Sequence, residues 1–148
     1  MFLSALDLTA ISTALPDIVN DFQSEEYAWI GSAYTLSSTA LIPLTAGMAT
    51  IFGRRPVMVT AIVVFAVGST LCGAAQSMTM LIVGRTIQGS AGGAILTVCE
   101  ILVVDLVPIA ERGKFFGILG AVWAAASALG PPVAGALASA GQWRWLFY

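Results

Sequence analysis

The chain alternates between long apolar stretches and short polar connections. Most of these stretches come close to the about 20 residues that a helix needs to cross a bilayer. The pattern predicts five membrane spans and the beginning of a sixth, at residues 1–16, 28–49, 57–75, 80–106, 115–138 and 145–148. Trp29 and Tyr34, near the start of the second stretch, suit a position at the membrane interface. Because the first stretch is short and the last stops at Tyr148, we expect an incomplete bundle of six helices.

Composition places the chain in the membrane. Of its 148 residues, 58% are hydrophobic and only 9% are charged, whereas soluble domains carry about 25% charged residues. The sequence therefore predicts an all-α, multi-pass integral membrane protein. There is no basic stripe for nucleic acid, and the absence of histidine excludes metal sites and general bases built on that residue. With no metal-ligand cluster and no nucleophile–base pair, we expect no enzyme, catalytic residue, metal or cofactor.

Basic residues predict the orientation of the spans. Arg54 and Arg55 lie in the second connection, Arg112 and Lys114 in the fourth, and only Arg144 in the fifth. Because basic connections stay on the cytoplasmic side, the second and fourth connections are expected there, and the N-terminus with them.

One arginine lies inside a predicted span. Arg85 stands in the stretch Leu81–Gly93, among apolar and small residues, with Gln88 one turn further on. An arginine at the centre of a membrane helix is unfavourable by roughly 2.5–3.5 kcal/mol on insertion scales. Arg85 is therefore expected to face a protein interior or a water-filled path, and the same argument applies to Asp7 in the first stretch.

Four motifs follow one another along the chain. They lie at Leu6–Pro16, Ala46–Arg55, Leu81–Gly93 and Gly117–Gly135. In this order they resemble the N-terminal half of a major facilitator superfamily transporter, and most closely the fourteen-span drug:proton antiporters, especially the fungal exporters. The resemblance implies a partial N-terminal six-helix bundle of the major facilitator fold.

The second motif resembles the family loop that works as a cytoplasmic latch. Gly53 permits the tight turn, and Arg54 and Arg55 are expected to pair with Asp105 or Glu111. The chain departs from the family pattern at Ala46, Thr50 and Ile51, and Thr50 replaces the usual aspartate. The alternative is that the basic residues act only as topology anchors. The expected cytoplasmic gate comprises Gly53, Arg54, Arg55, Asp105, Glu111 and Arg112.

The third motif resembles the family signature whose arginine is associated with proton coupling. A guanidinium changes the proton affinity of a nearby carboxylate, so proton gain or loss could be tied to helix movement. Asp7, Arg85 and Gln88 are the candidates for coupling or for lining the cavity. The alternatives are a static polar plug at Arg85 and a structural anchor at Asp7. Counted from the cytoplasmic edge, Asp7 is expected to lie too far from Arg85 for a direct salt bridge. Gln88 and water then remain as the expected partners of Arg85.

The fourth motif resembles the antiporter signature, which in the family marks export by antiport. Small residues on one helix face permit tight packing, and the prolines bend the helix into a hinge or a seal. The residues that fall on the pattern are Gly117, Ala126, Gly130, Pro131 and Gly135.

The resemblance implies a proton-coupled antiporter that exports small amphipathic compounds by alternating access. Its expected partners are a small-molecule substrate, protons, the lipid bilayer and the missing C-terminal half of the transporter. The plasma membrane is favoured over the vacuolar membrane. Two alternatives remain open, a truncated fragment that does not transport and a symporter that imports a small solute.

Overall fold

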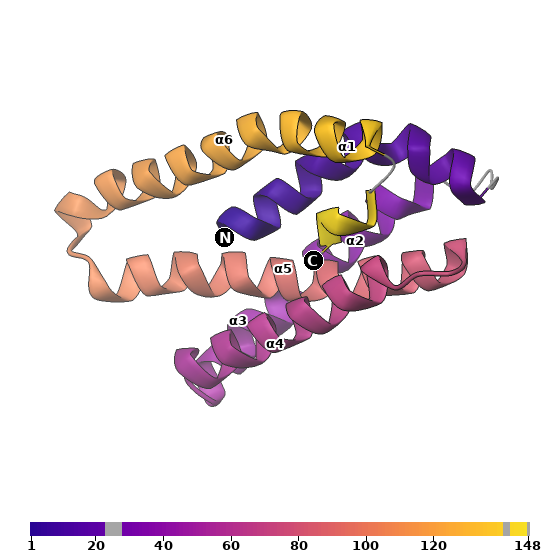
Figure 1. Cartoon of the computed structure of the whole chain (residues 1–148). Helices are drawn as coiled ribbons and strands as arrows, with labels where there is room; N and C mark the ends of the chain where they lie inside the picture. Colours follow the sequence, from indigo (N-terminus) through magenta and orange to yellow (C-terminus); the bar gives the residue numbers. More distant parts are fainter. Residues whose placement is uncertain (23–27, 141–142, 148) are drawn as a thin grey trace.

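The computed structural model describes residues 1–22, 28–140 and 143–147, and every element in these ranges is helical (Figure 1). The all-α prediction is therefore confirmed. The elements are α1 (Phe2–Phe22), α2 (Ala28–Ala40), α3 (Ile42–Ile51), α4 (Arg54–Gly73), α5 (Met78–Leu106), α6 (Ile109–Ser139) and the short 3₁₀ helix η2 (Trp143–Phe147).

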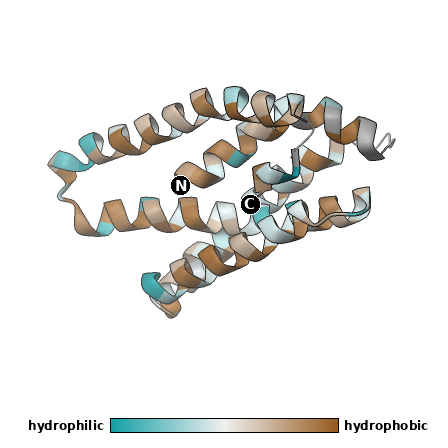
Figure 2. Ribbon diagram, viewed as in Figure 1, coloured by the Kyte–Doolittle hydropathy of each residue, from teal (hydrophilic) through white to brown (hydrophobic). Residues whose placement is uncertain are grey.

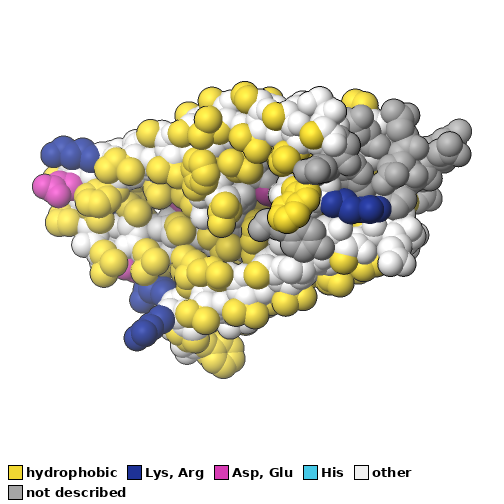
Figure 3. All heavy atoms as spheres, in the orientation of Figure 1, with side chains coloured by type: hydrophobic (Ala, Val, Ile, Leu, Met, Phe, Trp, Pro, Cys, Tyr) yellow, Lys and Arg dark blue, Asp and Glu magenta, His cyan; other side chains and the backbone are white. Residues whose placement is uncertain are grey.

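The surface of the bundle is apolar. Within the described ranges, α4, α5 and α6 are long and apolar enough to cross a membrane, and Phe2–Thr13 and Ile42–Ile51 are shorter apolar helical segments. Apolar residues dominate the ribbons between their ends (Figure 2), and on the visible face hydrophobic side chains cover the middle while most of the charged ones gather at the ends (Figure 3). A surface of this kind suits lipid, as the composition predicts.

The second predicted span, residues 28–49, is divided in the structure. α2 ends at Ala40 and α3 begins at Ile42, with Pro43 in the first turn of α3. Proline has no backbone N–H and its ring crowds the carbonyl four residues earlier, so an uninterrupted helix through this position is disfavoured. The stretch predicted as the second span therefore consists of two helices, and the sequence carried the signal for this break in Pro43.

Other helix ends also differ from the predicted spans. The first span was predicted to end at residue 16, but α1 continues through Pro16 to Phe22. The acidic residues Glu25 and Glu26 that follow lie outside the described residues. α6 begins at Ile109, directly after Pro108. The charged residues expected in a loop at 111–114 therefore form its first turns, because a proline is well accommodated just before a helix. The stretch that was expected to begin a sixth span is the short helix η2.

The helices form two packed groups. α1 packs chiefly on α6, whereas α5 packs chiefly on α4 and α2, and few contacts join one group to the other directly. The short helix η2 contacts α1, α4 and α6. Figure 1 shows the same division, with α1 beside α6 and α4 beside α5. Interactions that cross between the groups therefore fix how one is placed on the other.

Small residues form the face of α6 that packs on α1. Ala126, Gly130, Ala134 and Ala138 are buried and recur at every fourth position. A Cβ added at Gly130 would collide with Thr9 Oγ1 on α1. Small residues at this spacing let two membrane helices approach closely.

The antiporter motif lies only partly on this face. Ala126 and Gly130 belong to it, and Gly135 lies close to α1, where an added Cβ would be 3.7 Å from Thr13 Cγ2. Gly117 and Pro131 are exposed. At 3.6 residues per turn, a spacing of nine residues places Gly117 on the opposite side of α6 from Ala126. The prediction that the motif residues share one packing face is therefore wrong. α6 also stays helical through Pro131.

We expect Gly130→Ala to destabilise the protein, because the new methyl group would force α1 away from α6. Overpacking of a well-filled contact typically costs about 1–3 kcal/mol. The matched control is Gly120→Ala on the same helix, where an added Cβ meets nothing within 4 Å. Thermal unfolding in detergent measures both variants. Equal melting temperatures for the two would contradict the packing assignment.

Candidate functional site

Arg85 is fully buried in the bundle and forms a direct ion pair with Asp7. The Nη1 atom of Arg85, on α5, donates a hydrogen bond of 2.6 Å to Asp7 Oδ2 on α1. The exposed fractions of the two residues are 0% and 7%. The expectation that Asp7 lies too far away was wrong. In Figure 1 the N-terminus lies midway along the bundle rather than at its end.

Three further side chains contact the guanidinium. Nη1 of Arg85 also donates to Gln88 Oε1 at 2.6 Å, as the shared helix face predicts. The Cζ atom lies 4.4 Å from the centre of the Tyr34 ring and 5.9 Å from that of Phe147. Aromatic faces attract a guanidinium within about 6 Å. Tyr34 is 4% exposed, so its predicted place at the membrane interface was wrong.

A chain of hydrogen bonds leads from the ion pair to η2. Gln88 Nε2 donates to Ser69 Oγ on α4 at 3.4 Å, and Ser69 Oγ donates to the carbonyl oxygen of Phe147 at 2.5 Å. The contact between α4 and α5 depends on Gly68, where a Cβ would lie 2.7 Å from the backbone nitrogen of Gln88. The cluster therefore joins α1, α5, α4 and η2. Sequence reasoning missed Ser69 and Phe147, because one serine and one aromatic residue in apolar stretches carry no distinguishing signal.

A cavity of about 280 Å³ lies beside the ion pair. Asp7, Ser69, Thr70 and Gln88 supply its polar lining, and the remaining lining residues are apolar. Nε and Nη2 of Arg85 are buried and have no hydrogen-bond partner among the described residues. A guanidinium carries five N–H donors, and Nη1 alone serves both Asp7 and Gln88. The cluster thus combines a buried carboxylate next to a cavity with a cation that retains unused donors.

The residues of the expected gate lie near the α3–α4 and α5–α6 junctions. Arg54 at the start of α4 forms an ion pair with Asp105 near the end of α5. Arg112 donates to the carbonyl oxygens of Val107 and Val104, at 3.1 and 2.6 Å. A positively charged side chain near a helix C-terminus interacts favourably with the unpaired carbonyl oxygens there. Arg112 therefore links the start of α6 to the end of α5.

Other members of the expected gate take no part in these contacts. Arg55 and Glu111 are exposed, and neither forms an ion pair within the described part of the chain. Gly53 adopts a φ of 89° in the turn before α4, a conformation that glycine tolerates best. Thr50, in the position of the family's aspartate, donates its hydroxyl to the carbonyl oxygen of Ala46 and supplies no charge.

Comparison with known families decides what kind of protein carries this cluster. Residues 1–148, the whole chain, match the Major Facilitator Superfamily. The chain belongs to this superfamily. The family resemblance inferred from the four motifs is therefore confirmed.

Individual relatives within this superfamily include efflux pumps. The chain is 51% identical to "Efflux pump FUS6" of Gibberella fujikuroi, with 99% of this chain and 27% of that protein covered. It is 50% identical to "MFS-type efflux pump LUC4" of a Fusarium species, covering 99% and 26%, and 46% identical to "Efflux pump dotC" of Dothistroma septosporum, covering 100% and 26%. The chain thus spans about a quarter of the length of these relatives.

We expect Arg85→Ala to destabilise this member of the superfamily strongly. Removing one partner of a buried ion pair leaves the other charge uncompensated, at a typical cost of about 3–5 kcal/mol. Adding Asp7→Asn to Arg85→Ala should recover part of that loss, because the isolated carboxylate disappears. Unfolding by denaturant in detergent measures the two single variants and the double variant.

The matched comparison is Arg54→Gln, which breaks an ion pair whose side chains are 46% and 33% exposed. Exposed pairs contribute only about 0–1 kcal/mol. Similar losses of stability for Arg54→Gln and Arg85→Ala, or additive losses for the Arg85 and Asp7 changes, would contradict this view of the site.

Proposed function

We propose that this protein exports small amphipathic molecules across a membrane in exchange for protons. The observation that carries the proposal is the buried Arg85–Asp7 ion pair, which joins α1 of one helix group to α5 of the other. The names of the efflux-pump relatives support export, and the antiporter-like motif on α6 supports exchange rather than symport.

In this proposal Asp7 is the group that takes up and releases the proton. A proton on Asp7 converts its carboxylate into a neutral acid and removes the charge attraction to Arg85. Arg85 then keeps its bond to Gln88 on its own helix and its contact with Tyr34. The α1–α6 group is left with a weaker attachment to the α2–α4–α5 group, so protonation favours a rearrangement between the groups. The cavity that Asp7 lines is the proposed route for the proton.

The gate of this protein is proposed to work with fewer charges than the family pattern provides. Thr50 contributes none, so the Arg54–Asp105 pair and the bonds from Arg112 remain to hold α4, α5 and α6 together. Both side chains of the ion pair are partly exposed, which makes it easy to break and reform. A contact of this kind suits a latch that must open in every transport cycle.

Alternating access also requires a partner against which this bundle can move. In the known architecture of such transporters, substrate binds between two bundles near the middle of the membrane. The proposal therefore includes a second helical bundle, with the substrate bound between the two. The identity of the substrate depends on both surfaces.

Transport in inside-out vesicles with an acidic lumen tests this function. We expect the full-length protein to drive uptake of the amphipathic dye rhodamine 6G, because protons leaving the lumen are exchanged for dye entering it. Asp7→Asn should abolish the accumulation driven by the pH gradient while leaving downhill dye movement, since a neutral side chain cannot carry the proton. Fluorescence quenching of the dye follows both processes.

Lys114→Gln is the matched control, because it removes an exposed charge far from the ion pair and should transport normally. Unchanged gradient-driven uptake in Asp7→Asn would contradict the role of Asp7. Loss of dye from vesicles on acidification of the lumen would indicate symport and would contradict antiport.

We propose that the protein lies in the plasma membrane with the α3–α4 and α5–α6 junctions on the cytoplasmic side. The N-terminal end of α1 then points toward the cytoplasm from midway along the bundle. We expect Lys114→Cys to react with a membrane-impermeant maleimide only from the cytoplasmic side, and Ser77→Cys, before α5, only from the outside. Labelling of intact cells and of inside-out vesicles separates the two. The opposite pattern would overturn the orientation.

A further inference from the structure

An apolar groove lies between α3 and α4, with α5 as its floor. Its volume is about 460 Å³, within the about 300–1,000 Å³ typical of small-molecule sites. Leu44 and Phe52 on its rim are 58% and 67% exposed, whereas Val57 and Ala61 deeper inside are buried. It shares no lining residue with the cavity beside Asp7. It is therefore a second, separate site.

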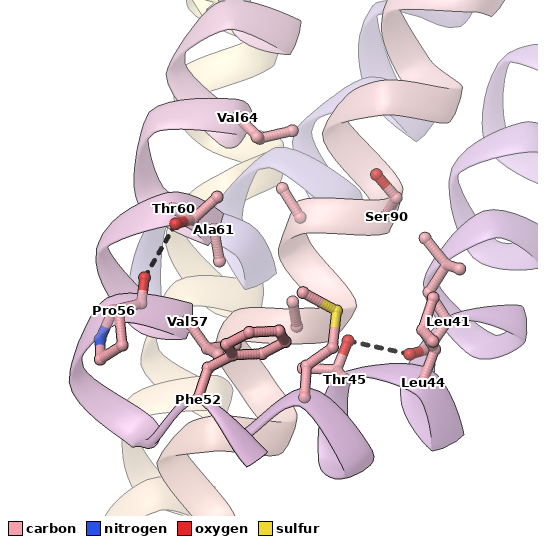
Figure 4. A pocket seen from close by; sticks show the side chains of 13 residues that line it. Leu41, Leu44, Thr45, Phe52, Pro56, Val57, Thr60, Ala61, Val64 and Ser90 are labelled. Carbon is pink, nitrogen blue, oxygen red and sulfur yellow. Dashed lines mark hydrogen bonds between the residues drawn. The ribbon is translucent and has the colours of Figure 1, made fainter. Parts of the chain in front are cut away.

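The hydroxyl groups in the groove are already satisfied. Thr45 donates to the carbonyl oxygen of Leu41 at 2.8 Å and Thr60 to that of Pro56 at 2.8 Å, as Figure 4 shows. Ser90 donates to Ile87 at 2.6 Å. Each bond stays within one helix or its first turn, so these groups offer no donor to a ligand. The groove thus presents a hydrocarbon-like surface, which suits an apolar ligand without hydrogen-bonding groups.

The length of the groove matches one leaflet of a bilayer. It follows α3 from Leu41 to Phe52 and α4 from Pro56 to Val64. The 10 residues of α3 extend about 15 Å at 1.5 Å per residue, which is half of the about 30 Å hydrocarbon core. A single acyl chain spans this depth.

One end of the groove carries positive charge. Phe52 and Pro56, which line it there, flank the turn that leads into Arg54 and Arg55. Arg54 is paired with Asp105, whereas Arg55 is exposed and forms no ion pair among the described residues. This end therefore keeps one guanidinium that forms no ion pair among the described residues and that an anionic headgroup can reach.

We propose that this groove binds one acyl chain of an anionic phospholipid, with the headgroup at the Arg54–Arg55 end. Lipid tails are as apolar as the groove, so van der Waals packing alone gives little preference for one lipid over another. The arginine supplies the preference, because one basic residue near a membrane surface favours anionic lipid by about fivefold. In the proposed orientation this end faces the cytoplasmic leaflet, which is rich in anionic lipid.

Photochemical labelling in nanodiscs tests this proposal. The full-length protein is reconstituted with trace phosphatidylserine or phosphatidylcholine, each carrying a diazirine in the middle of one acyl chain, and the adducts are mapped by mass spectrometry. We expect adducts along the rim, on Met48, Phe52 and Thr60, and about fivefold more from phosphatidylserine. Arg55→Gln should bring the two lipids close to equal labelling, whereas Lys114→Gln, at an exposed cation on α6, should leave the preference intact.

Variants that fill the groove provide the second part of this test. Ala94→Phe, on its floor, should reduce rim adducts from both lipids, whereas Val63→Phe, on the exposed surface of α4, should not. Ser90→Leu is a smaller filling change in case Ala94→Phe does not fold, which the melting temperature reveals. Three results would overturn the proposal: rim adducts no more frequent than those near Val63, an unchanged lipid preference in Arg55→Gln, or unchanged rim labelling in the filled variants. A complete absence of rim adducts is the extreme case of the first result, and it leaves another protein surface as the remaining candidate occupant of the groove.

Discussion

The ion pair between Arg85 and Asp7 is the interaction on which the remaining structure depends. Two charges in an apolar bundle are tolerated only when they are paired and further hydrogen-bonded. The pair meets this condition by joining helices from the two packed groups, so the placement of α1 and α6 on α2, α4 and α5 follows from it. In the proposed mechanism, a proton on Asp7 weakens this link between the two groups.

The other polar contacts extend this link. Gln88 accepts a hydrogen bond from the guanidinium through Oε1 and donates one to Ser69 through Nε2. Ser69 in turn donates to the carbonyl oxygen of Phe147. The ring of Phe147 in turn lies over Arg85. A change at the ion pair therefore reaches η2 through two independent contacts. Small residues make this possible, because Gly68 and the small face of α6 bring the backbones close enough for short side chains to meet.

The parts of this site that were predictable are those that carry a free-energy penalty. A charge in an apolar stretch must have a partner, so Asp7 and Arg85 stood out from the sequence alone. Their pairing was not predictable, because depth had been counted from the first residue as if the chain began at the membrane edge. Tyr34 was assigned to the interface because aromatic residues near span ends usually lie there, and tertiary packing overrode that tendency. Pro43 signalled the break between α2 and α3 directly.

The most direct test of the central claim measures whether the two helix groups move when Asp7 takes up a proton. Spin labels at Thr79 on α5 and Ser139 on α6, both exposed, report the distance between the groups in the reconstituted full-length protein. The account predicts that the distance distribution differs between acidic and alkaline buffer, and that Asp7→Asn shows the acidic distribution in both. The same pH dependence in Asp7→Asn as in the unaltered protein would contradict it.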